Sequence, residues 1–148
     1  MDNCKHLTIT PISKNLKSNA NIDFREQWMR TRTGDLNWCW DDSKYNKAKP
    51  GEYFAFFHHK NKVVIHRIIA VKPPSQRLPS WSSNVGQGDR NVLELSDTLR
   101  EISWKEWIET GCSHVCMGTY RTTDLLKDRE KMYNILRELE WRVESSDV

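Results

Sequence analysis

Four tryptophans lie where their rings are able to bind a ligand rather than fill a core. Trp38 and Trp40 flank a cysteine in a polar stretch, Trp81 precedes Ser-Ser-Asn, and Trp28 falls on a short predicted helix. Indole faces stack on nucleobases and surround methyl or cationic groups. Considered one at a time, each of these tryptophans is also compatible with packing in the hydrophobic core. Together with nearby amide and carboxylate groups, they predict a base pocket formed by Trp28, Trp38, Trp40, Trp81, Asn84, Gln87 and Asp89.

Positive charge is concentrated in the middle of the chain. The overall formal charge is +3, but residues 43–77 carry eight basic side chains and one acidic side chain, Glu52. Residues 1–42 are neutral, and residues 78–148 sum to −4. A basic segment with interleaved aromatics attracts a polyanion by releasing its counterions; a solubilising surface is the alternative. The residues predicted to hold a nucleic-acid backbone are Lys60, Lys62, Arg67, Lys72, Arg77 and Arg90.

Histidines and cysteines raise the question of a metal site. Cys112, His114 and Cys116 are closely spaced, and further ligands are available in Cys39, His58, His59 and His66. Zinc sites usually contain a second close ligand pair, which is missing here. The cysteine segment also resembles a strand, so its three side chains point into a core. We therefore predict no metal and no cofactor, and His66 is interpreted as a core histidine.

Catalytic motifs are missing from the sequence. It contains no Gly-x-Ser-x-Gly, no His-Glu-x-x-His and no phosphate-binding glycine loop. Asp41, Asp42 and Asp89 are isolated carboxylates, too few to specify a two-metal nuclease. We therefore predict no catalytic residue, although a hydrolase or nuclease remains an alternative because short catalytic sets leave no local pattern.

Length and composition favour one domain over residues 1–148. The chain has 148 residues, of which 37% are hydrophobic and 10% aromatic, which argues against disorder. No apolar run approaches a membrane span, and no signal peptide is recognisable. The four cysteines are then interpreted as thiols of an intracellular protein, cytoplasmic or nuclear.

Hydrophobic periodicity predicts the elements that position these residues. Strands are expected over 5–12, 53–58, 63–71, 91–95 and 114–122, with 53–58 and 63–71 forming an antiparallel hairpin. Residues 35–49 are expected to be irregular, and 73–90 to form a long loop. Helices are expected over 23–32, over 103–109 behind a Ser103–Glu106 capping box, and from Asp124 onward. Trp104, Trp107 and Trp141 are assigned to the core, as is a C-terminal stripe of Leu125, Met132, Leu136, Leu139 and Val143.

This order of elements indicates an α+β fold, a small curled mixed sheet or open barrel with helices outside it. The layout resembles the PUA-like superfamily, especially its EVE and YTH branches. The resemblance covers residues 5–109 and rests on the segment KPGEYFAFF at 49–57, the strand at 63–71, and short motifs at 9–13 and 92–95. In YTH domains one tryptophan on the first helix and one after the hairpin form an aromatic cage. Trp28 and Trp81 match those places in order.

The resemblance implies a reader of a modified base in DNA or RNA. Trp38 and Trp40 have no counterpart in it, and the segment 123–143 is an addition that we interpret as a docking helix. The predicted function is therefore a non-enzymatic nucleic-acid-binding domain. A nucleic-acid hydrolase on the same scaffold and a protein-interaction module that uses 123–143 are the alternatives; no membrane partner is expected.

Overall fold

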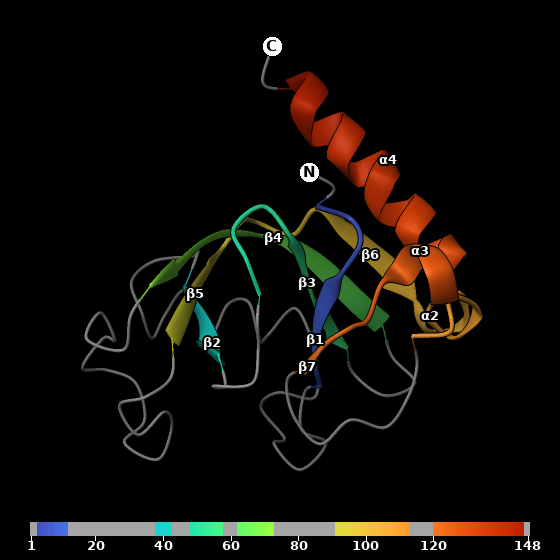
Figure 1. Cartoon of the computed structure of the whole chain (residues 1–148), viewed down its shortest axis with the longest axis horizontal. Coiled ribbons are helices and arrows are strands. Elements are labelled where there is room, and N and C mark those ends of the chain that lie inside the picture. The colour runs from blue at the N-terminus through green and yellow to red at the C-terminus, as the bar shows by residue number, and fades with distance from the viewer. Residues whose placement is uncertain are drawn as a thin grey trace.

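The computed structural model describes residues 3–11, 38–42, 48–57, 62–72, 91–112 and 120–146. These residues form a mixed α+β fold in which seven strands build one connected sheet and three helices lie beside it (Figure 1). The strands are β1 (Leu7–Pro11), β2 (Trp38–Asp42), β3 (Tyr53–Phe57), β4 (Lys62–Lys72), β5 (Asn91–Leu95), β6 (Arg100–Ser103) and β7 (Tyr120–Arg121). The helices are α2 (Trp104–Glu109), α3 (Leu125–Asp128) and α4 (Glu130–Ser146). The α+β class and the mixed sheet are confirmed.

The long strand β4 joins two parts of the sheet. Its first half pairs antiparallel with β3 on one side and with β6 on the other. Its second half, after a register shift between Ile68 and Ala70, pairs with β5, which in turn pairs with β2. β1 adds to β3 in parallel, and β7 follows β1. In the described part of the chain the sheet stays open, with no pairing that closes it into a barrel.

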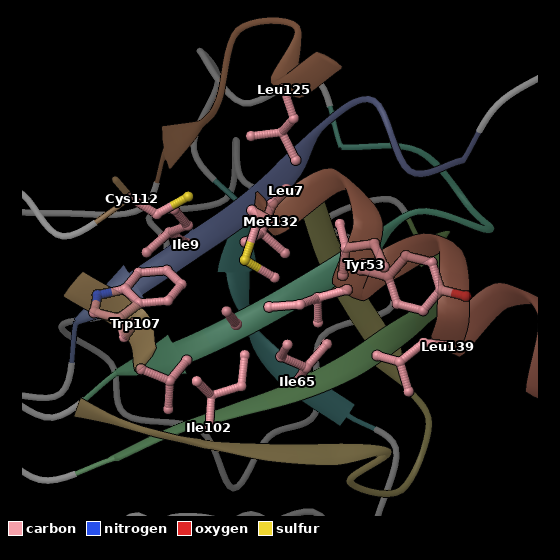
Figure 2. Close-up of a cluster of buried hydrophobic side chains, with 14 of the residues drawn as sticks. Leu7, Ile9, Tyr53, Ile65, Ile102, Trp107, Cys112, Leu125, Met132 and Leu139 are labelled. Atoms are coloured by element: carbon pink, nitrogen blue, oxygen red, sulfur yellow. The ribbon is translucent and has the colours of Figure 1, made fainter. Parts of the chain in front are cut away.

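One face of the sheet carries the main core. Leu7 and Ile9 of β1 lie beside Tyr53 and Ala55 of β3, and all four are fully buried because alternate residues of a strand share a face. Helices α2, α3 and α4 cover this face with Trp107, Leu125, Met132, Leu136 and Leu139 (Figure 2). The C-terminal segment is therefore packed on the fold's own core.

The opposite face carries a second buried cluster. Phe54, Phe56 and Val64 alternate with the residues of the main core and pack with Ala48, Ile68 and Leu95. His66 lies on this face, where its ring contacts Phe56 edge-on and its Nδ1 lies 2.9 Å from the carbonyl oxygen of Ser96. Its interpretation as a core histidine is confirmed.

Local capping signals set the ends of α2. Ser103 Oγ accepts a hydrogen bond from the Glu106 N–H at 3.1 Å, as the capping box predicts. The helix ends at Thr110, and Gly111 follows with φ +77°, a conformation that favours glycine. The strand β6 before this helix was missed by the sequence analysis, because only its pairing with β4 distinguishes it from a polar loop.

Three sequence expectations are wrong. Residues 38–42 form the strand β2 rather than irregular structure, because β5 supplies backbone partners that the local sequence does not show. The helix expected from Asp124 is two helices, interrupted at Arg129, whose backbone is not helical and whose Nε donates to the Gly111 carbonyl. Trp141 is 67% exposed and outside the core, and Val143 is only half-buried.

The remaining expectations fall outside the described residues. They are the helix over 23–32, the loop over 73–90 and most of the strand expected over 114–122, of which β7 is the described end. None of the described helices combines the length and apolar composition needed to cross a bilayer.

Candidate nucleic-acid interface

The sheet places the tryptophan strand β2 two strands away from the end of the basic strand β4, with β5 between them. In one row across the sheet, Trp38 of β2 pairs with Glu94 of β5, which pairs with Ala70 of β4. In a second row, Asp41 of β2 pairs with Val92 of β5, which pairs with Lys72 of β4. Neighbouring strands lie about 4.8 Å apart, so the backbones of β2 and β4 are about 10 Å apart in these rows. Trp40 lies between the two rows, within a register irregularity of β2.

Only part of the predicted base pocket can be placed. Trp38 and Trp40 lie on β2, which ends the sheet path on that side within the described residues. Trp28, Trp81, Asn84, Gln87 and Asp89 lie outside the described ranges. The structure therefore brings the two β2 tryptophans near β4, and the other pocket residues stay a prediction.

Three predicted backbone-binding residues lie on β4. Lys62 pairs with Glu101 of β6 at 3.2 Å, and Arg67 pairs with Glu140 of α4 at 3.3 Å. Arg67 thus faces the helix-covered side of the sheet, whereas Lys72 ends the strand beside β5. Lys60, Arg77 and Arg90 are not among the described residues.

The single acidic residue of the basic stretch is neutralised. Glu52 accepts two hydrogen bonds from the Arg121 guanidinium, from Nε at 3.0 Å and from Nη2 at 2.6 Å. The Glu52 side chain is buried, and the bidentate pair fixes β7 against the start of β3. The charge of Glu52 is therefore balanced by Arg121, just as Lys62 and Arg67 of the same stretch are paired with Glu101 and Glu140.

A polar cluster under α4 was missed by the sequence analysis. The Glu140 carboxylate accepts from Tyr53 Oη at 2.7 Å, from Arg67 Nη2 at 3.3 Å and from Asn3 Nδ2 at 3.3 Å. The Cys4 thiol lies 3.9 Å from the same carboxylate. Cys4 and Tyr53 are fully buried, so no substrate reaches them and the cluster fastens α4 to the sheet. The only indication of this cluster in the sequence is the acidic residue Glu140, which directly follows Leu139 of the apolar stripe.

The pKa of Tyr53 is raised well above its ordinary value. Burial is the main cause, and the hydrogen bond to Glu140 and its negative charge add to it. The folded state therefore holds the phenol proton more tightly than the unfolded chain, whose tyrosine pKa is about 10. This contribution to stability is present below pH 10 and is lost as the pH rises above it.

We predict that replacing Tyr53 by phenylalanine reduces the loss of stability at alkaline pH. The free energy of unfolding of the unsubstituted chain should fall between pH 9 and pH 11, by up to about 1.4 kcal/mol per pH unit from this residue. Urea unfolding of both proteins at several pH values measures the difference. Equal pH dependence in the two proteins would show that the Tyr53 pKa is not raised.

The described residues offer little else for catalysis or metal binding. They contain no cluster of three metal-ligating side chains. Cys112 is a buried free thiol whose pKa is raised by burial, which disfavours the thiolate. His58, His59, His114 and Cys116 lie outside the described ranges, and the side chain of Cys39 is likewise undescribed. A shallow depression of about 400 Å³ beside α4 is lined by Arg100, Glu130, Lys131, Asn134, Ile135 and Glu138.

Comparison of the chain with models of known protein families found no match, and comparisons with curated proteins and with solved structures found none either. The resemblance to the PUA-like superfamily thus rests on the sequence motifs alone.

Proposed function

We propose that the chain is a nucleic-acid-binding domain of PUA-like fold that takes one base, most favourably a modified base, into a tryptophan-walled pocket. The observation that carries this proposal is the placement of β2 and β4 in one sheet. Trp38 and Trp40 lie about 10 Å from the last residues of the strand that runs through the basic stretch. In this proposal the tryptophans of β2 stack on the base and the basic residues of β4, two strands away, hold the phosphates.

Affinity in this arrangement comes mainly from charge. A base stacked on an aromatic side chain contributes about 1–3 kcal/mol, which alone gives a very weak complex. Residues 43–77 carry a net charge of +7, and phosphate contacts by such groups release counterions. The basic residues therefore hold the backbone, while the tryptophans and the amides Asn84 and Gln87 select the base.

Separate substitutions distinguish the pocket from the charged surface. We expect Trp81→Ala to weaken binding of a modified oligonucleotide by about 5- to 150-fold, from the loss of one stacking partner, and to affect an unmodified one much less. Lys72→Ala should weaken both oligonucleotides alike and reduce the dependence of log affinity on log salt by about one. Fluorescence anisotropy with labelled oligonucleotides measures both effects.

Trp141→Ala is the matched control, because it removes an indole that lies on α4, away from β2. It should leave both affinities unchanged. Equal losses for the two oligonucleotides in Trp81→Ala would remove the pocket and keep the electrostatic surface. Cleavage of the labelled strands during long incubation, with or without a divalent metal, would instead indicate the hydrolase.

A further inference from the structure

An exposed tryptophan lies on the outer side of α4. Met132, Leu136 and Leu139 of this helix are buried against the sheet, whereas Trp141 is 67% exposed. At 3.6 residues per turn, Trp141 lies about 180° around the helix from Met132. The ring therefore points away from the body of the protein.

Arg137 continues this outer side towards the start of the helix, and Tyr133, four residues earlier, is partly buried and packs against the main core. The three residues follow one another at intervals of four, which places them along one face. Arg137 Nη1 donates to Tyr133 Oη at 3.1 Å, and the guanidinium carbon lies 5.8 Å from the centre of the tyrosine ring. Trp, Tyr and Arg are the residue types that contribute most to binding in protein interfaces. We refer to the exposed residues Arg137, Trp141 and Glu144 as the outer face of α4.

The end of α4 is open to a second helix. Beyond Glu140, whose carboxylate is held against the sheet, residues 141–145 are exposed or half-buried. Figure 1 shows that the helix runs away from the sheet towards the C-terminus, so that its last turns stand clear of the strands. Another helix is able to lie along this part without colliding with the sheet.

The charges of the outer face complement a second copy of the same face. Arg137 precedes Trp141 by four residues, and Glu144 follows it by three, with both on the same side of the indole. In an antiparallel pair with a twofold axis near Trp141, each Arg137 therefore meets the partner's Glu144. A single antiparallel alignment of the two helices therefore allows both ion pairs and the contact between the two indoles.

We propose that the outer face of α4 is a self-association surface at which two copies pair their C-terminal helices antiparallel, Trp141 against the partner's Trp141. One helix pair buries less than the roughly 1,200 Å² typical of stable complexes. The dimer is therefore weak and depends on protein concentration. This inference is independent of the proposed nucleic-acid binding.

Sedimentation velocity of the full chain over a wide concentration range tests the proposal. The unsubstituted protein should shift towards dimer as concentration rises, and Trp141→Ala should weaken the association roughly tenfold or more. Ile108→Ala is the control, because Ile108 is a similarly exposed apolar residue on α2; it should leave the association unchanged. A protein that stays monomeric at the highest concentration overturns the proposal, as does equal weakening by both substitutions.

A charge exchange tests the register. Arg137→Glu and Glu144→Arg should each weaken the dimer, since each places like charges opposite one another, and the double variant should restore it. Circular dichroism checks that all variants keep their helix content. Failure of the double variant to recover would contradict the antiparallel register.

Discussion

Replacing Glu140 by alanine is expected to lower the free energy of unfolding by about 3 kcal/mol, because it leaves several donors without their shared acceptor. The Glu140 carboxylate is 14% exposed and joins the N-terminal segment, β3 and β4 to α4. Without it, the Tyr53 hydroxyl and the Arg67 guanidinium stay largely buried and lose their acceptor. Urea denaturation followed by circular dichroism measures the change.

Glu138→Ala is the matched control for this prediction. Glu138 lies two residues earlier on the same helix, is half-exposed, and pairs with Arg142 at 2.6 Å and with Arg100 at 3.8 Å. Exposed pairs of this kind contribute between 0 and about 1 kcal/mol, so the loss should stay below that limit. Similar losses for the two variants would show that the Glu140 cluster does not fasten the helix.

Trp107→Ala is expected to cost about 3–5 kcal/mol, the largest effect of a single substitution that we predict. Trp107 is fully buried and extends from α2 into the main core, as Figure 2 shows. Removing the indole deletes its apolar burial and leaves a cavity that the surrounding side chains fill only in part. Thermal and urea unfolding both report the loss.

Trp141→Ala makes the same chemical change at an exposed position. Measured at low protein concentration, its effect on unfolding should lie within about 0.5 kcal/mol. Comparing the two variants therefore distinguishes the stability contribution of a buried tryptophan from that of an exposed one, both on helices that cover the same face of the sheet. A large loss for Trp141→Ala would contradict the outward placement of its ring.

Elements with strong local signals were predictable from the sequence. The strand β4 follows from nine nearly continuous β-branched and apolar residues, and its hairpin with β3 follows from the short connection between them. The start of α2 follows from Ser103 and Glu106, and its end from Gly111. In each case the residues that decide the structure lie within a few positions of one another.

The errors arose where distant partners decide the structure. β2 reads as an irregular polar stretch, and its pairing is with β5, about fifty residues further along the chain. The interruption at Arg129 coincides with a hydrogen bond to Gly111, which helical periodicity does not reveal. Trp141 was assigned to the core from its apolar neighbours, although its helical angle from Met132 already places it on the opposite side.

The candidate site stays a prediction in kind, and the structure places only some of its residues. Residue types alone indicated tryptophans for stacking and a basic stretch for phosphate, and β4 does carry Lys62, Arg67 and Lys72. The ion-pair partners of these basic residues could not be predicted from the sequence, since Arg67, for example, pairs with Glu140, seventy-three residues away. Such a pairing depends on the packing of α4, which the spacing of charges does not encode.

Titration of labelled DNA and RNA oligonucleotides, modified and unmodified, with the unsubstituted protein at two salt concentrations tests the central claim most directly. The proposed function predicts measurable binding at low salt, a marked loss of affinity at high salt, and a preference for at least one modified base. Absence of binding to every oligonucleotide at low salt would contradict it.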